Sequence, residues 1–102
     1  MTAIREFRES PLHMGKNEKI AYPITVPSSW GTSPTSPTCK IYNLAGVDLS
    51  STKLSGSASV SGSVITTPLV QALEAKQQYK LVITWTDSGN TLECFGFIFA
   101  DD

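Results

Sequence analysis

The stretch QALEAKQQYKLVITW, Gln71 to Trp85, decides the fold of this chain because its two halves favour different structures. The second half places apolar residues at every second position, as a strand with one buried face does: Tyr79, Leu81, Ile83 and Trp85. The first half, residues 71–78, is rich in helix-favouring side chains, but it is short and lies close to Pro68. We therefore predict a loop over 71–78 that carries Leu73 into the core and leads into the strand.

A hairpin follows, with one strand from Tyr79 to Thr86 and a second from Thr91 to Ala100. Between them lies DSGN, whose Gly and Asn tolerate the positive backbone angles of a tight turn. A two-residue loop at Ser88-Gly89 then puts four pairs on one face: Trp85 with Leu92, Ile83 with Cys94, Leu81 with Gly96, and Tyr79 with Ile98.

The other face of this hairpin carries three phenylalanines, Phe95, Phe97 and Phe99. They exceed what a small two-layer domain needs, because each sheet buries only one face there. Either the N-terminal segment or the loop around Trp30 covers these rings within the chain, or a neighbouring subunit docks on them. Coverage by the N-terminal segment and docking of a neighbouring subunit are both true if the N-terminal segment is exchanged between subunits.

The rest of the chain predicts further short strands. Strict alternation from Ile20 to Val26 indicates a strand, and Pro23, which lacks an amide donor, places it at a sheet edge. Residues 27–38, PSSWGTSPTSPT, predict a loop in which Trp30 either folds back on the core or marks a contact. Residues 39–44 predict the next strand, and residues 56–67 predict two strands that turn at Ser61-Gly62. We expect an all-β fold.

Residues 1–19 differ from the rest in mixing many charges with a few apolar side chains, among them Ile4 and Phe7. Pro11 and Gly15 interrupt any long helix there. We predict an extended N-terminal arm over 1–19 and a β-sandwich domain over 20–102. The arm is either a disordered terminus or a segment ordered against a neighbouring subunit.

The overall composition excludes several classes of function. A chain of 102 residues, 40% of them hydrophobic, fits one core. A formal net charge of -1 gives no broad field for specific nucleic acid or for an anionic membrane surface. The charged start lacks the apolar core of a signal peptide, and no apolar run is long enough to cross a bilayer.

No group of residues indicates an enzyme, a metal site or a cofactor. His13 is the only histidine and has no assignable partner for a catalytic triad or a metal. Cys39 and Cys94 lie outside any C-x-x-C spacing, so we expect two free, packed thiols, although a pair between them stays open. Nucleotide-binding and calcium-binding motifs are absent from the sequence. We expect a protein without catalytic activity.

Parts of the sequence resemble two known groups of proteins. The Leu73 to Tyr79 spacing resembles the tyrosine corner of fibronectin type III and related immunoglobulin-like sandwiches, in which the phenol bonds to backbone of the preceding loop. Several phrases resemble those of small structural proteins of tailed bacteriophages and prophages: REF with SP, EKIAY, WGTSPTS, KIY, GSASVSGSVITTP and YKLVITWTDSGNTLECF. Together these resemblances imply a virion component with an immunoglobulin-like core, made in the bacterial cytoplasm.

The function that follows is an accessory head (decoration) protein or a head-tail connector component, present in multiple copies. It would bind capsid, portal, neck or tail subunits through these partner-binding residues: Ile4, Phe7, Trp30, Phe95, Phe97 and Phe99. The alternative is a host-recognition or carbohydrate-binding module of a tail tip or fibre, in which Trp30, Tyr42 and the Thr/Ser-rich loop form a stacking platform.

Overall fold

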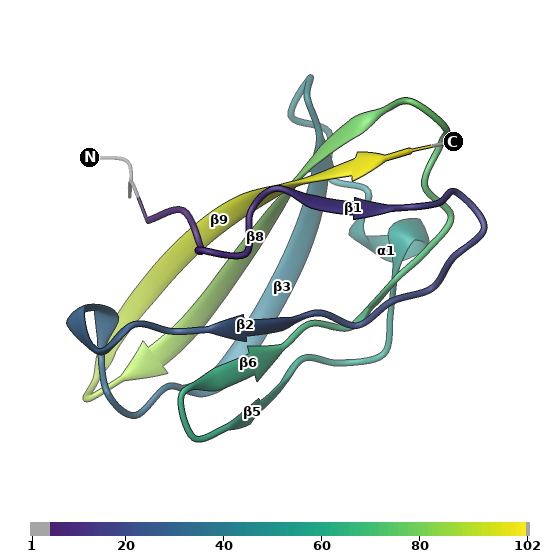
Figure 1. The fold of residues 1–102 in the computed structure, drawn as a ribbon. Helices are drawn as coiled ribbons and strands as arrows, with labels where there is room; N and C mark the ends of the chain where they lie inside the picture. Colours follow the sequence, from purple (N-terminus) through teal and green to yellow (C-terminus); the bar gives the residue numbers. More distant parts are fainter. Residues whose placement is uncertain (1–4, 102) are drawn as a thin grey trace.

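The computed structural model describes residues 5–101, which form β-strands with almost no helix (Figure 1). In chain order the elements are β1 (Leu12–Met14), β2 (Pro23–Thr25), the 3-10 turn η1 (Ser28–Trp30), β3 (Thr35–Asn43), α1 (Ser50–Lys53), β4 (Leu54–Ser55), β5 (Ser59–Ser61), β6 (Val64–Thr66), β7 (Leu69–Val70), β8 (Gln78–Asp87) and β9 (Asn90–Ala100). The prediction of an all-β fold is confirmed.

The hairpin of β8 and β9 is the centre of the larger sheet, whose strand order is β1-β9-β8-β3. Its register is the predicted one, with Ile83 opposite Cys94 and Leu81 opposite Gly96. Ser88 and Gly89 both have positive φ, 52° and 82°, as a two-residue hairpin loop of type I′ requires. The turn residues and the period-2 pattern therefore specify the same pairing.

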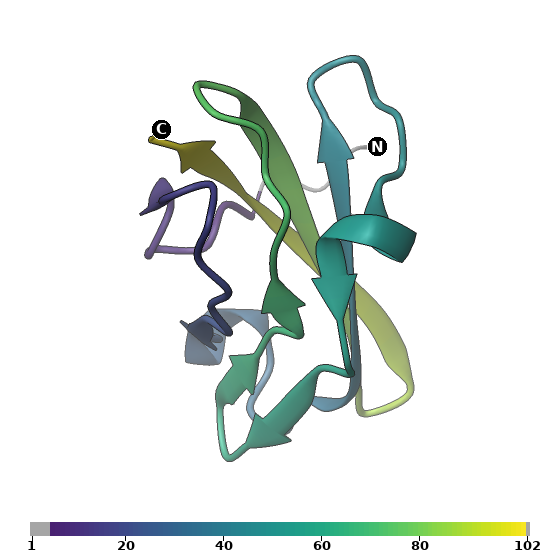
Figure 2. The same ribbon diagram turned by 90° about the vertical axis from the view of Figure 1, so that its right-hand side faces the viewer.

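The second layer is a smaller sheet of order β2-β6-β5, which lies in front of the larger sheet in Figure 1. Among residues 5–101, β2 pairs only with β6, so the prediction that Pro23 lies at a sheet edge is confirmed. The two-stranded pair β4-β7 continues this layer (Figure 2). Within residues 5–101, these buried apolar side chains fill the core: Phe7, Met14, Ile24, Val26, Ile41, Ile65, Val70, Leu73, Tyr79, Leu81, Ile83, Trp85, Cys94, Ile98 and Ala100.

The segment before β8 is a loop, as predicted. Residues 71–77 contain one turn and no helix, and Leu73 is 4% exposed. The Tyr79 hydroxyl accepts a hydrogen bond from the backbone N–H of Glu74 at 2.9 Å, and Lys53 Nζ lies 5.6 Å from the centre of the Tyr79 ring. The phenol thus ties the loop to the base of β8.

Replacing Tyr79 with Phe removes this acceptor and leaves the ring in place. We expect the free energy of unfolding to fall by about 1–2 kcal/mol, because the Glu74 N–H loses its partner in a partly buried position. Urea denaturation measures this change. Tyr42→Phe, on the outer face of the sheet, is the matched control and should change stability by less than about 0.5 kcal/mol. Equal effects of the two substitutions would contradict a structural role for the Tyr79 hydroxyl.

The described part of the N-terminal segment differs from the expected arm, because it packs on the same chain. β1 runs parallel to β9, and Phe7 lies beside Phe95, with the Phe7 N–H donating to the Phe95 carbonyl at 2.9 Å. The Ser10 hydroxyl accepts from the Phe97 N–H at 3.1 Å. These contacts satisfy the edge of β9, whose backbone groups would otherwise lack partners.

Phe7 explains why this segment is held on the sheet. Its side chain is 1% exposed, and it lies against Gly96, where a Cβ would come within 2.0 Å of the ring. The residue therefore belongs to the core, contrary to the expectation that Phe7 binds a partner. Ile4, the other residue expected in that role, lies outside the described residues.

Several strand boundaries also differ from prediction. β2 spans only Pro23–Thr25, whereas the alternation predicted a strand from Ile20 to Val26. β3 begins at Thr35 inside the predicted loop, with an irregularity before Thr38 that accommodates Pro37 and a positive φ of 50° at Ser36. The turn between β5 and β6 uses residues 62 and 63, because Gly62 takes the first loop position with φ 59°. The pairing shifts accordingly, and Val60 lies opposite Ile65.

Candidate functional site

The face of the larger sheet that is turned away from the core is rich in aromatic side chains. On this face Val82 pairs with Phe95, Lys80 pairs with Phe97, and Tyr42 of β3 lies beside Lys80. We call the set the aromatic face: Tyr42, Lys80, Val82, Phe95, Phe97 and Phe99. The aromatic face forms because the β8–β9 hairpin carries apolar side chains on both of its faces in the part that lies away from the Ser88-Gly89 turn.

The side chains of the aromatic face cover one another in part. The rings of Phe95 and Phe97 meet edge to face with centroids 5.8 Å apart, and Lys80 Nζ lies 5.0 Å from the centre of the Phe95 ring. At the β1 side, His13 stacks on Phe99 at 5.2 Å. All members of the face remain half-buried. The N-terminal segment thus reaches this face at the Phe99 corner through His13.

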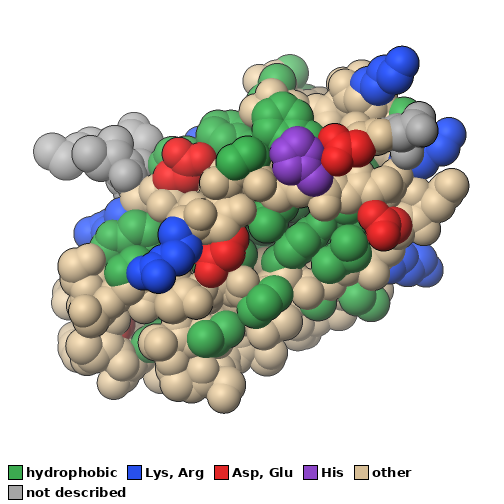
Figure 3. Space-filling view, in the orientation of Figure 1, with side chains coloured by type: hydrophobic (Ala, Val, Ile, Leu, Met, Phe, Trp, Pro, Cys, Tyr) green, Lys and Arg blue, Asp and Glu red, His purple; other side chains and the backbone are tan. Residues whose placement is uncertain are grey.

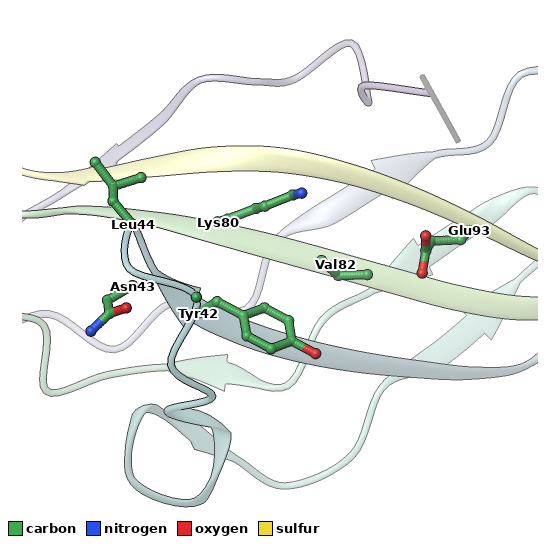
Figure 4. Close-up of a pocket in the computed structure, with 7 residues that line it drawn as sticks. Tyr42, Asn43, Leu44, Lys80, Val82 and Glu93 are labelled. Carbon is green, nitrogen blue, oxygen red and sulfur yellow. The ribbon is translucent and has the colours of Figure 1, made fainter. Parts of the chain in front are cut away.

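A shallow hollow of about 460 Å³ adjoins the aromatic face (Figure 4). Its lining comes from β3, the loop after it, β8 and β9: Tyr42, Asn43, Leu44, Gly46, Lys80, Val82 and Glu93. Leu44 and Val47 in that loop are 64% and 51% exposed. The Asn43 side-chain oxygen accepts from the backbone N–H groups of Ala45 and Val47, both at 3.0 Å, so an ordered turn holds these apolar side chains in solvent.

Trp30 lies in a different place, at the end of the molecule that carries the β8–β9 turn. Its ring is stacked on Trp85 with centroids 6.5 Å apart and an interplanar angle of 25°. It borders a second hollow, of about 330 Å³, whose lining is Arg5, Ser29, Trp30, Gly31, Thr32, Asp87, Ser88, Asn90 and Leu92. Trp30 and Tyr42 therefore do not form the single stacking platform that the sequence suggested.

His13 has a partner that the sequence did not reveal. Its Nδ1 lies 3.0 Å from both carboxylate oxygens of Asp101, and the two side chains are 54% and 56% exposed (Figure 3). Only the parallel pairing of β1 with β9 brings these residues together across 88 positions, and no local pattern could have signalled it. Among residues 5–101 no group of three or more His, Cys, Asp and Glu side chains could hold a metal ion.

The two cysteines lie in one row of the larger sheet, on either side of Ile83. Two strand spacings separate them by about 10 Å, which is too far for a disulfide. Both are free thiols. Burial raises the pKa of both thiols to about 12. The Cys94 thiol makes a smaller contribution at Cys39, and Glu9 and Glu93 make smaller contributions at Cys94. They are packing residues with little thiolate at neutral pH.

This burial has a consequence at alkaline pH. In the unfolded chain each thiol has an ordinary pKa of 9.0, whereas in the folded chain it keeps its proton until about pH 12. The folded state then binds more protons, so the free energy of unfolding falls as the pH rises above about 9. Urea unfolding at about pH 8 and about pH 10.5 should show a smaller fall in a Cys39→Ala, Cys94→Ala variant than in the wild type. Identical falls would contradict the assignment.

Comparison with known proteins adds no relative. No family model, no curated protein and no solved structure matches the chain. Within the described residues no helix has the length and apolar character that crossing a membrane requires. The structural features that bear on function are the aromatic face and the two hollows.

Proposed function

We propose that this protein is a non-enzymatic structural component of a tailed-phage particle, which attaches to other virion subunits through the aromatic face. The observation that carries the proposal is the position of Phe95, Phe97 and Val82 on the outer side of the larger sheet, where the second layer does not reach them. The resemblance of the sequence phrases to small virion proteins supports the same conclusion. We place the protein at the head or at the head-tail connector, in multiple copies.

An immunoglobulin-like sandwich is part of this proposal. The strands β9, β8 and β3 correspond in order to G, F and C of that fold, and β2, β6 and β5 correspond to B, E and D. The hydrogen bond between the Tyr79 hydroxyl and the Glu74 N–H supports a tyrosine corner before strand F. Ile24 and Leu81 lie in the core on the two facing strands, where antibody domains carry their disulfide.

The aromatic face suits docking for energetic reasons. Each Phe is already half-buried, and covering the remainder contributes on the order of 1 kcal/mol per ring. Lys80 lies over Phe95, and Glu93 lies at the rim of the adjoining hollow, so a partner meets an apolar centre with charges at its edge. Repeated copies in a particle multiply such modest contacts.

The test compares two lysine substitutions on opposite sides of the molecule. Phe97→Lys places a charge at the centre of the aromatic face, whereas Leu69→Lys changes a leucine on β7 that is 40% exposed. Cosedimentation with particles that lack the protein should show binding of wild type and of Leu69→Lys, and binding of Phe97→Lys weakened about 100-fold or more. Thermal unfolding checks that both variants are folded.

Failure of the wild-type protein to bind such particles would count against the proposal as a whole. Equal binding by a folded Phe97→Lys variant would show that the aromatic face is not the docking surface.

A further inference from the structure

The charges of the molecule are distributed unevenly. Three segments rich in Ser, Thr and Gly, residues 27–38, 55–63 and 84–91, contain one charged residue, Asp87, out of the 17 charged residues of the chain (8 basic and 9 acidic). The fold brings these segments together at one end. Thr35 pairs with Thr86, and Val26, immediately before the first segment, donates its N–H to the Ser63 carbonyl. In Figure 3 this end, at the lower left, is mostly uncharged polar surface.

Asp87 is buried at this end of the molecule, and its carboxylate accepts hydrogen bonds there. It is 6% exposed; one carboxylate oxygen accepts from the Ser33 N–H at 3.0 Å and the other from the Ser88 hydroxyl at 3.1 Å. Gly31 has a φ of 120°, and a Cβ there would lie 2.2 Å from the carboxylate. Asp87 therefore holds the Trp30 loop against the β8–β9 turn, and the loop needs glycine at position 31.

The hollow between this loop and the turn combines two kinds of surface. Trp30, supported by its stack on Trp85, supplies a rigid aromatic wall. The other lining residues include several whose side chains donate or accept hydrogen bonds: Ser29, Thr32, Ser88, Asn90 and Arg5. The lining includes one basic and one acidic residue, Arg5 and Asp87, so its formal charge is zero.

From this geometry we infer that the hollow beside Trp30 binds a hexose unit of a neutral polysaccharide. A pyranose ring has an apolar C–H side that stacks on an aromatic face and a rim of hydroxyls that both donate and accept. Its neutrality matches a lining whose formal charge is zero. The hollow, at about 330 Å³, is at the small end of ligand pockets, which suits one or two sugar units. The site is separate from the aromatic face and does not rest on the particle function.

The test is a titration of the labelled protein with neutral oligosaccharides of glucose, galactose, mannose and N-acetylglucosamine, and with oligogalacturonate as the acidic probe. Amide chemical shifts of residues 28–33 and 86–92 should move with at least one neutral probe, with a Kd of about 1 mM. Two results would overturn the inference. One is that these amide signals do not move with any neutral probe at about 20 mM, and the other is that oligogalacturonate binds more tightly than every neutral probe.

Variants separate binding by the hollow from unspecific effects. Trp30→Leu should raise the Kd for the tightest-binding neutral oligosaccharide about 10-fold or more. Tyr42→Leu, which removes an aromatic ring at the other hollow, should leave this Kd unchanged. Because Trp30 also packs on Trp85, Asn90→Ala provides a second variant that leaves the core intact. We expect it to raise the Kd for the same oligosaccharide about 3-fold or more. Unchanged affinity in both Trp30→Leu and Asn90→Ala would overturn the assignment. Phe97→Lys should bind the sugar normally, so the two proposals can fail independently.

Discussion

Gly96→Ala should be among the most damaging single substitutions in this protein. A Cβ at position 96 would lie 2.0 to 2.4 Å from three atoms of the Phe7 ring, and neither group has room to move, because Gly96 is in the central hairpin and Phe7 is 1% exposed. The ring must leave its site, so we expect a loss of about 3–5 kcal/mol, the usual effect of deleting a buried Phe. Chemical denaturation measures the loss.

A double-mutant cycle shows whether Phe7 is the cause. Phe7→Ala alone should also cost about 3–5 kcal/mol, and the double variant with Gly96→Ala should cost at least about 2 kcal/mol less than the sum. Gly15→Ala is the matched control, since its Cβ would meet only the flexible Glu18 side chain at 3.3 Å. Additive losses in the cycle would mean that Phe7 does not occupy the space above Gly96.

Leu73→Ala should have the second large effect. Leu73 comes from a loop, but its side chain is 4% exposed and belongs to the core that closes the base of the two layers. Removing it leaves a cavity in the core, and we expect the free energy of unfolding, measured by urea denaturation, to fall by about 2–4 kcal/mol.

Leu69→Ala is the control for this prediction, because Leu69 is 40% exposed on β7 and only four positions away. Its replacement should change stability by less than about 1 kcal/mol. Similar losses in the two variants would indicate that the 71–77 loop does not reach the core.

Much of the fold could be predicted where neighbouring residues carried the information. The period-2 pattern of β8 and β9, with Ser88-Gly89 between them, specifies a register in which the inward side chains of β8 from Tyr79 to Trp85 are all apolar. The loop over 71–77 followed from its length and from Pro68. The β5–β6 turn was wrong by one residue, because either neighbour of Gly62 can share a two-residue loop with it.

The candidate sites were predictable only in part. Phe95, Phe97 and Phe99 were identified as a surplus on one face, and the structure leaves them half-buried there. Phe7 was expected at a partner because nothing near it in sequence suggests that Gly96 leaves space for its ring. The hollow beside Trp30 was missed as a unit, since Arg5, Asp87 and Asn90 reach it from separate segments.

By itself, then, the sequence determined the all-β class, the central hairpin with its register, the edge position of Pro23 and the loop that carries Leu73 into the core before Tyr79. These features depend on alternation, turn residues and short spacings, which act between near neighbours in the chain. The tertiary structure alone decided that residues 5–14 join the larger sheet, that Phe7 fills the space above Gly96, and that His13 meets Asp101. Those contacts span about 90 residues and depend on which edge and which cavity remain open once the hairpin has formed, and no local pattern encodes that choice.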